Sequence, residues 1–283
     1  MKVIASLILA AFATVAHVAS AQERDWSAPQ QPFAIYGNTH YVGTAGISAI
    51  LLTSPQGHIL LDGTTGKGAS VVAANIQALG YRLKDVKYIL GSHSHEDHAG
   101  GIAALQKLTG AQVLVGAANV ASMRSGVSPS TDPQFGSLSN FAGAAKVRGV
   151  ADGEVVKLGP LVVTAHSTPG HTAGGTSWSW QSCEAGQCRN VVYVDSVTAV
   201  SADGYRFSDH PELVAQFRNT FSIVEGLSCE VAIAAHPEFN DLWGRQQRAA
   251  QEGSAAYVDS KGCRIIAEAG RKRLETRLAS EQR

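Results

Sequence analysis

Short apolar runs separated by turns dominate residues 34–62 of the chain. None of these runs has the period of a helix, and each is short enough to be a strand. The runs lie at residues 34–36, 40–42, 47–53 and 58–61. They predict consecutive strands of a meander.

The period changes to a helical one at Ala69. Apolar residues then share one helical stripe as far as Leu79, and Gly80 is placed to cap the helix. Residues 86–90 are apolar except for Lys87 and predict a buried strand, and the helix that follows it ends at Gly110. This part of the chain therefore runs from a strand through a polar motif into a helix.

Strands and helices return in a similar order in the second half of the chain. Apolar runs predict strands at residues 155–158, 161–165, 176–180, 191–194 and 231–234. A helix begins near Pro211, a residue favoured in the first turn, and a charged amphipathic helix covers residues 263–281. The pattern predicts an α+β fold in which two sheets pack face to face with helices outside.

Residues 122–145 interrupt this order. They are rich in Ser, Pro, Gly and Asn and have no sustained period. A loop of this length inside a compact domain is usually functional. We expect it to help shape a binding pocket.

The first 21 residues have the features of a secretory signal peptide. Lys2 precedes an apolar run from Val3 to Val18, and Ala19-Ser20-Ala21 supplies the small residues of a cleavage site. The run is shorter than the roughly 20 residues that a membrane span needs. We expect cleavage after Ala21, a single mature domain over residues 22–283, and a soluble protein in the periplasm.

The charge of the chain excludes two classes of function. Lys and Arg together number 23, as do Asp and Glu, so that the formal net charge is zero. Such a chain has no excess of positive charge with which to bind nucleic acid or an acidic membrane. Hydrophobic residues make up 45% of the sequence, which predicts a packed globular protein.

Four cysteines fit an oxidising compartment. Neither the pair Cys183 and Cys188 nor the pair Cys229 and Cys263 has the two-residue spacing of a zinc knuckle. We expect two disulfides, for which three connectivities are open. Cys183 and Cys188 are close enough in sequence to staple a loop between two strands.

The densest cluster of metal-binding side chains follows the predicted strand at residues 86–90. It reads Ser-His-Ser-His-Glu-Asp-His and contains His93, His95, Asp97 and His98. In an extended segment the first two histidines point the same way, and the turn into the next helix moves Asp97 and His98 to a neighbouring position. Imidazole and carboxylate without thiolate suit zinc and leave coordination positions for water. One strand end therefore offers ligands to two metal ions.

Two further histidines follow later strands. His171 lies in a Pro-Gly-His-Thr turn, and His236 lies between Ala235 and Pro237. Loops at the ends of strands commonly hold active-site groups. Together with the first motif, these residues complete two sites of three protein ligands each, the number expected for catalytic zinc.

The remaining histidines of the mature chain are interpreted as structural, with one exception. His40, His58 and His210 lie in strand or turn contexts without partners in the sequence. His166 is five residues before His171 and is a further candidate for a contact with metal or substrate.

The His-x-His-x-Asp-His motif, the Pro-Gly-His-Thr turn and the distant His236 resemble the metallo-β-lactamase superfamily over nearly all of residues 35–265. The resemblance implies a four-layer αββα sandwich with two mixed sheets. Within the superfamily, these residues are most similar to those of the subclass B3 zinc β-lactamases. That similarity implies a first zinc ion on His93, His95 and His171 and a second on Asp97, His98 and His236.

The resemblance extends to residues 193–198 and to the cysteines. It implies that Ser196 hydrogen-bonds metal-bound water and that Thr198 helps to receive the substrate carboxylate. The spacing of Cys229 and Cys263 is similar to that of a disulfide of the subclass, which implies this pairing and leaves Cys183 with Cys188.

Relatives of the glyoxalase II type place a bridging aspartate in the same segment, and Asp195 would fill that role if the strand were shifted by one residue. Adjacent side chains of a regular strand face opposite sides, so that Asp195 and Ser196 cannot both face the metals. We favour Ser196, with Asp195 in a structural role, because of the export signal and the Ser-Val-Thr continuation.

The resemblance implies a β-lactamase that acts on penicillins, cephalosporins and carbapenems and gives antibiotic resistance. A metal-bound hydroxide would attack the lactam carbonyl, while the two zinc ions stabilise its oxygen and the departing nitrogen, without an acyl-enzyme. Asp97 would orient the hydroxide. Gln134, in the loop at residues 122–145, is a further candidate substrate contact.

Two other functions fit parts of the pattern. A lactonase or thioesterase of the same fold would use Asp195 as a bridging ligand and would not turn over lactams. A non-enzymatic zinc-binding protein would leave amides and esters intact, but it has no need of a complete six-ligand set. No sequence patch indicates a partner chain, so that we expect a monomer with a small-molecule substrate.

Overall fold

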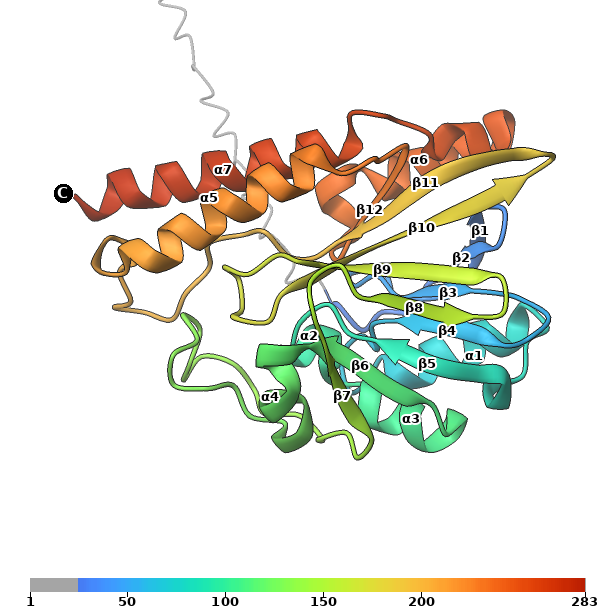
Figure 1. The fold of residues 1–283 in the computed structure, drawn as a ribbon, viewed down its shortest axis with the longest axis horizontal. Helices are drawn as coiled ribbons and strands as arrows, with labels where there is room; N and C mark the ends of the chain where they lie inside the picture. Colours follow the sequence, from blue (N-terminus) through green and yellow to red (C-terminus); the bar gives the residue numbers. More distant parts are fainter. Residues whose placement is uncertain (1–24, 283) are drawn as a thin grey trace, which may run out of the picture.

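Two β-sheets pack face to face at the centre of the protein, in a computed structural model that describes residues 25–282. Helices cover the outer face of each sheet, which gives four layers in the order α, β, β, α (Figure 1). The predicted sandwich is confirmed. The predicted signal peptide at residues 1–21 lies outside the described residues.

The first sheet is mixed. It contains β1 (Phe33–Tyr36), β2 (Thr39–Tyr41), β3 (Ile50–Leu52), β4 (His58–Leu61), β5 (Val86–Leu90), β6 (Gln112–Gly116) and β7 (Val147–Val150), which pair in sequence order. The strands β1 to β4 form the expected antiparallel meander. From β4 to β7 the strands run parallel, so that their carboxyl ends lie at one edge.

The second sheet is also mixed. It contains β8 (Val155–Leu158), β9 (Leu161–Ser167), β10 (Thr176–Glu184), β11 (Gln187–Val194) and β12 (Val231–Ala234). The spatial order is β12-β11-β10-β9-β8, and only β11 and β12 are parallel neighbours. The strands β9, β11 and β12 consequently run in one direction and end at the same edge of the sheet.

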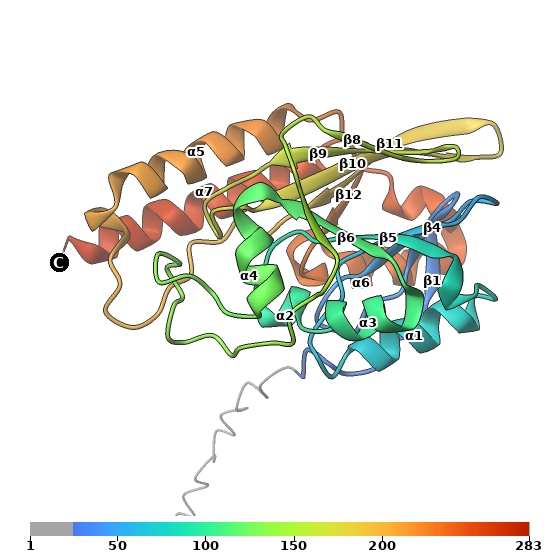
Figure 2. The same ribbon diagram turned by 60° about the horizontal axis from the view of Figure 1, so that its bottom comes forward.

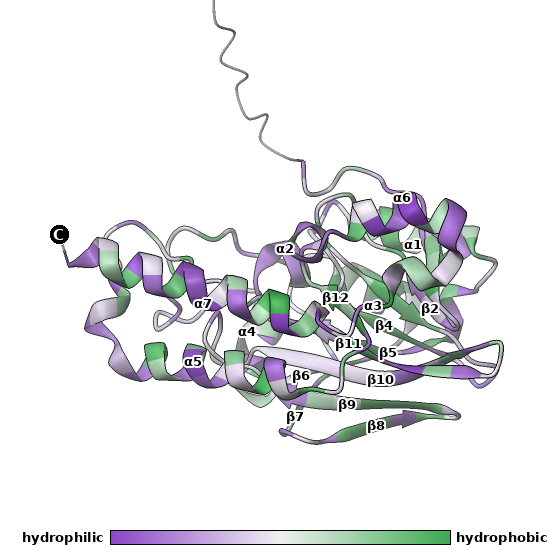
Figure 3. Cartoon of the chain, turned by 90° about the horizontal axis from the view of Figure 1, so that it is seen from above, coloured by the Kyte–Doolittle hydropathy of each residue, from purple (hydrophilic) through white to green (hydrophobic). Residues whose placement is uncertain are grey.

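Helices from the two halves of the chain lie on opposite sides of the sandwich (Figure 2). The first sheet is covered by α1 (Ala69–Ala78), α2 (Glu96–Ala99), α3 (Ile102–Thr109) and α4 (Val120–Ser125). The second sheet is covered by α5 (Pro211–Gly226) and α7 (Gly262–Glu281), which lie side by side with many hydrophilic residues (Figure 3). The helix α6 (Leu242–Glu252) packs beside β1, where Trp243 meets Phe33 edge to face.

Three hydrophobic clusters connect the layers. The space between the sheets holds Leu61, Leu90 and Trp178, all fully buried. The preceding residues Leu60 and Ile89 face the helices on the other side of the first sheet. Because both faces of the sheet are covered here, residues 59–61 of β4 and 89–90 of β5 are continuous apolar runs rather than alternating ones, whereas Lys87 near the start of β5 is exposed.

The differences from the predicted elements have local causes. β3 is shorter than residues 47–53 because the chain turns before it, where the Thr44 N–H donates to the carbonyl of Ile47. β10 and β11 are longer than predicted because polar residues continue the hairpin to its tip. The expected loop at residues 122–145 begins inside α4, so that its first four residues are helical. The strands β6 and β7 and the helix α6 were not predicted.

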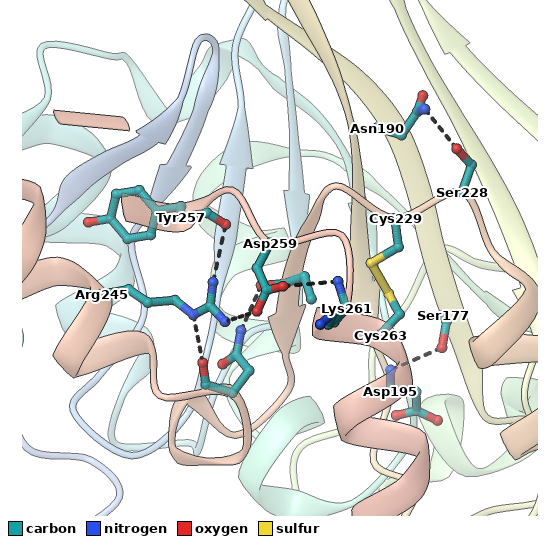
Figure 4. The surroundings of a disulfide bond; sticks show 12 residues. Ser177, Asn190, Asp195, Ser228, Cys229, Arg245, Tyr257, Asp259, Lys261 and Cys263 are labelled. Atoms are coloured by element: carbon teal, nitrogen blue, oxygen red, sulfur yellow. Dashed lines mark hydrogen bonds and ion pairs between the residues drawn. A yellow bond between two sulfur atoms is a disulfide. The ribbon is translucent and has the colours of Figure 1, made fainter. Parts of the chain in front are cut away.

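Both expected disulfides are present. Cys183 and Cys188 are directly opposite residues of the β10–β11 hairpin, with a Cα–Cα distance of 4.0 Å. Cys229 and Cys263 connect the segment before β12 to the first turn of α7 (Figure 4). The second disulfide therefore fixes α7 to the sheet that it covers.

Candidate metal centre

The histidine motif is held in place by a buried aspartate that follows β4. The backbone N–H of Ser92 donates to one carboxylate oxygen of Asp62 at 2.7 Å, and the Ser92 hydroxyl donates to the other at 2.6 Å. The chain then stays extended through His95, after which α2 begins. This anchor fixes His93 and His95 at the carboxyl end of β5 and places Asp97 and His98 on the first turn of the helix.

Three histidines form a first cluster of possible ligands. His93, His95 and His171 each contribute one donor atom, and these atoms lie within 4.8 Å of one another. All three side chains are buried. The rings of His93 and His171 meet at nearly a right angle with centroids 4.8 Å apart. His171 is distant from the other two histidines in the sequence, and the packing of β9 against the first sheet brings it beside them.

A second cluster lies beside the first. His93, Asp97 and His98 have donor atoms within 4.8 Å of one another. His236, after β12, completes it, since its Nε2 lies 3.2 Å from His98 Nε2 and 3.4 Å from Asp97 Oδ2. The structure thus brings together all six residues that were expected to hold metal.

Four of these histidines are oriented by a contact at the ring nitrogen that points away from the cluster. His171 Nδ1 donates to the carbonyl of Thr198 at 2.8 Å. The other three contacts are with carboxylates, namely His93 Nδ1 with Asp195 at 2.7 Å, His95 Nε2 with Asp132 at 2.9 Å and His98 Nδ1 with Asp62 at 3.3 Å. Metal-ligating histidines characteristically make such contacts, because these set the tautomer and aim the free nitrogen.

Two buried ring nitrogens of the ligands have no hydrogen-bond partner within residues 25–282, namely His93 Nε2 and His98 Nδ1, of which the second faces Asp62 at 3.3 Å. His93 Nε2 is buried and faces the cluster, while its Nδ1 is bonded to Asp195. An unpaired buried nitrogen costs about 1–3 kcal/mol. A metal ion at this place would satisfy it, so that the residues fit a bound metal.

Burial sets the protonation of these ligands. It lowers the pKa of His171 to about 3, and the nearby His95 adds to this effect. Burial, followed by repulsion from His98, lowers the pKa of His93 well below its usual range. Although burial opposes its ionisation, the positive field of His98 and its hydrogen bonds hold the pKa of Asp97 well below normal. Neutral imidazole and ionised carboxylate are the forms that bind metal, and His93, His171 and Asp97 are held in them. Although burial opposes it, the charges of Asp97 and Asp62 raise the pKa of His98 to about 10, so that a metal ion would have to displace a proton there.

Three expected substrate or water contacts lie close to the clusters. Gln134 Nε2 is 3.4 Å from His95 Nδ1 and 3.4 Å from His171 Nε2. The Ser196 hydroxyl oxygen is buried and has no protein hydrogen-bond partner within residues 25–282. Thr198 is buried beside His171, which it holds through its carbonyl.

Asp195 lies behind His93 rather than between the two clusters. Its Oδ1 accepts from His93 Nδ1, and its backbone N–H donates to Ser177 Oγ at 3.0 Å (Figure 4). A β-carbon at Gly175 would come within 2.6 Å of Asp195 Oδ2, so that only glycine leaves room for the carboxylate. This packing opposes the bridging position that a glyoxalase II type site requires.

Sequence reasoning missed the two carboxylates that orient His98 and His95. Asp62 comes directly after the apolar run at residues 58–61 and also accepts from the Tyr193 hydroxyl at 2.7 Å. Asp132 lies in the loop at residues 122–145 that was expected to be functional. Two signals in the sequence could have identified them. Asp62 is a carboxylate directly after a buried strand, and Asp132 is a carboxylate in a loop that was expected to be functional.

The other four histidines of residues 25–282 lie outside both clusters. His166 lies in β9 and is 2.7 Å from Ser179 Oγ, so that it does not contact the predicted ligands. His40 and His58 pack against the ring of Tyr81. His210 stacks on Tyr205 before α5.

Comparisons with known proteins agree with this geometry. The sequence matches the family model described as "Metallo-beta-lactamase superfamily" over residues 42–183. The structure is similar to that of metallo-β-lactamase SMB-1 bound to 2-mercaptoethanesulfonate, with 75% identity, a TM-score of 0.91, and coverage of 91% of this chain and 100% of the other. It is also similar to MEM-A1, a subclass B3 metallo-β-lactamase from a soil metagenome, with 49% identity, a TM-score of 0.89 and coverage of 91% and 99%.

A third similar structure is MIM-1 of Novosphingobium pentaromativorans, with 43% identity, a TM-score of 0.84, and coverage of 91% of this chain and 93% of the other. Curated relatives share less. A hydroxyacylglutathione hydrolase of Anaeromyxobacter dehalogenans is 35% identical over 34% of this chain and 29% of its own length. One of Bradyrhizobium is 31% identical over 47% and 46%. The chain thus spans less than half the length of these curated relatives.

Two further observations complete the comparison. Within residues 25–282, none of the helices combines the length and the hydrophobicity that a membrane span requires. The family match covers half of the chain, and the solved structures share its fold with TM-scores of 0.84 to 0.91. The chain therefore belongs to the metallo-β-lactamase superfamily, where its structural relatives include enzymes of subclass B3.

Proposed function

We propose that this protein is a zinc-dependent β-lactamase that hydrolyses the amide bond of penicillins, cephalosporins and carbapenems and thereby gives antibiotic resistance. The observation that carries the proposal is the pair of ligand clusters that share His93, one with two further buried histidines and the other with Asp97 and His98, whose possible ligand atoms lie within 4.8 Å of one another in each cluster. The similarity to SMB-1 over 91% of the chain supports the lactam as substrate.

The two clusters supply two sets of three ligands. His93, His95 and His171 would hold the first zinc ion, and Asp97, His98 and His236 would hold the second. The donor set of imidazole and carboxylate, without thiolate, suits zinc and leaves positions for water. Bound zinc would supply a water-derived nucleophile at neutral pH and would stabilise negative charge on the lactam oxygen and nitrogen.

The protein's own groups position the reacting atoms. Asp97 is ionised, so that besides holding metal it accepts a hydrogen bond from the attacking water and orients it. The Ser196 hydroxyl, which has no protein partner within the described part of the chain, donates or accepts at the same water. Thr198 receives the substrate carboxylate, and Gln134 contacts the substrate beside His95 and His171.

The test is hydrolysis of a chromogenic cephalosporin and a carbapenem by the purified mature protein, before chelation, after it and after zinc is restored. We expect turnover that disappears with the chelator and returns with about two zinc ions per chain, measured by elemental analysis. A protein that holds two zinc ions and leaves both lactams intact would refute the proposal.

A thioesterase of the glyoxalase II type is the second candidate, because the curated relatives are hydroxyacylglutathione hydrolases. It requires a bridging aspartate, and the contact of Asp195 with His93 Nδ1 opposes this. The same preparations should be assayed with a glutathione thioester. Thioester turnover without lactam turnover would favour this candidate.

Export belongs to the same proposal. We expect the protein to be a periplasmic monomer that begins at Gln22 after removal of residues 1–21. N-terminal sequencing of protein recovered from the periplasm tests the cleavage site, and light scattering tests the oligomeric state. A chain recovered with Met1 intact would contradict the export signal.

A further inference from the structure

A shallow groove of about 580 Å³ runs along α7 and is lined on one side by Ala199. Ala199 forms its inner wall, directly after Thr198, and three basic residues of α7 line it, namely Lys272, Arg273 and Arg277. The groove is therefore lined by the end of the segment that carries Ser196 and Thr198.

Close packing fixes α7 against this segment. A β-carbon at Gly270 would lie 2.8 Å from the carbonyl oxygen of Val197, so that the helix backbone packs closely against the segment after β11 that leads to Thr198. Arg273 is one helical turn beyond Gly270. The helix thus has little freedom to move its basic residues away from the metal centre.

Arg273 is also connected to the second cluster. Its guanidinium carbon lies 4.8 Å from the centre of the Phe239 ring, within the range of a cation–π contact. The Phe239 ring is in turn 5.4 Å from the ring of His236. One aromatic ring therefore separates the positive charge of Arg273 from a proposed zinc ligand, while the side chain stays exposed.

The inner end of the groove has uncompensated positive charge. Arg277 is paired with Glu281 at 2.7 Å and contributes little. Within residues 25–282, neither Lys272 nor Arg273 has a carboxylate at ion-pair distance. An anion that enters from Ala199 would meet two cations that have no ion-pair partner in the described part of the chain, while the α7 acids Glu275 and Glu281 are paired with Arg218 and Arg277.

We propose that Arg273, assisted by Lys272, forms an anion subsite that favours lactams with a second anionic group beyond the ring carboxylate. The ring carboxylate is assigned to Thr198, and the groove starts at the next residue, so that a second carboxylate or sulfonate on the substrate can reach it. The inference rests on the proposed β-lactamase function. A positive groove raises the local concentration of such substrates and is screened by salt.

Benzylpenicillin and carbenicillin provide a matched test, because carbenicillin differs only by an additional side-chain carboxylate. The ratio of kcat/KM for carbenicillin to that for benzylpenicillin should be measured for the parent, Arg273→Gln, Arg273→Lys and Lys107→Gln. Lys107 is an exposed lysine of α3 on the opposite side of the sandwich, so that Lys107→Gln is the control for loss of one positive charge. Each ratio should be taken at about 0.01 M and about 1 M salt, between which the Debye length falls from about 30 Å to about 3 Å.

We expect Arg273→Gln to lower the ratio about fivefold at low salt and by much less at high salt, the size of an exposed charge interaction. Arg273→Lys should retain most of the ratio, and Lys107→Gln should leave it unchanged. An unchanged ratio in Arg273→Gln would overturn the subsite. A loss of kcat/KM that is equal for both penicillins and independent of salt would overturn the subsite as well, because it would indicate a structural effect through Phe239 and His236. No lactam turnover by the parent would instead refute the proposed function, and the subsite with it.

Discussion

Replacing Asp195 by asparagine tests whether this residue acts through His93 or holds metal itself. The side chain is buried, and Gly175 leaves no room for a larger one, so that the nearly isosteric Asp195→Asn is the least disruptive change. The amide oxygen can still accept from His93 Nδ1, but it cannot become charged. Burial, with the nearby Asp62, raises the pKa of Asp195 well above its usual range, so that its carboxylate form depends on the positive charge that a metal ion would bring to His93. Charge-assisted hydrogen bonds are about twice as strong as neutral ones.

The expected cost falls on affinity for the first zinc ion. Removal of an outer partner of a ligating histidine typically costs about 10- to 100-fold in metal affinity, which corresponds to about 1.4–2.8 kcal/mol. The short His93–Asp195 distance of 2.7 Å in a fully buried pair places the effect within this range. The number of zinc ions bound at saturation should stay the same, since Asp195 contacts no donor atom that faces the clusters.

Competition with a chromophoric chelator measures the affinity for zinc and the number of zinc ions bound at saturation, and elemental analysis checks that number. Asp203→Asn, at an exposed loop aspartate, is the control for loss of one carboxylate. An Asp195→Asn protein that binds one zinc ion fewer at saturation would show that Asp195 bridges the metals. A protein with unchanged affinity would show that the contact with His93 has no influence on binding.

Three further predictions follow from other parts of the molecule. Asp97→Ala, fully reloaded with zinc, should remain slower than the parent in lactam hydrolysis, and an equal rate would contradict its orienting role. Although burial opposes it, a hydrogen bond from Arg277 lowers the pKa of Glu281 to about 2 from 4.5, so that this stabilisation is complete above about pH 4.5 and lost towards pH 2. Glu281→Gln should therefore unfold up to about 3 kcal/mol more easily in urea at pH 7, with a difference that vanishes near pH 2. Loss of the disulfide Cys229–Cys263, which spans 34 residues, should cost about 4 kcal/mol in urea unfolding against about 2 kcal/mol for Cys183–Cys188, which spans 5, and equal costs would contradict the chain-entropy account.

The strongest sequence patterns predicted the elements that position the site. The bounds of β4, β5 and β12 coincide with the predicted strands because β4 and β12 are buried along their whole length and β5 is buried at both ends. The helix α6 has the sequence LWGRQQRAAQE, in which only Leu242 is buried, so that no apolar stripe announced it. Its position comes from tertiary packing against β1, which local sequence does not encode.

The candidate site was predictable in its ligands but not in their supports. His93, His95, Asp97 and His98 are neighbours in sequence, so that spacing alone brings them together. The contact of His95 with Asp132 spans 37 residues, and that of His93 with Asp195 spans 102. No local pattern specifies which carboxylate will lie behind which imidazole, because the choice depends on how the two sheets dock.

The two ligand clusters lie on the seam between the sheets. His93 to His98 follow β5 of the first sheet, whereas His171 follows β9 and His236 follows β12 of the second. A metal ion bound there would clasp the two halves of the sandwich together and would add its binding free energy to the stability of the whole fold. A shortage of metal would then have two effects: the protein would lose its catalytic activity, and its lower stability would make it more susceptible to proteolysis.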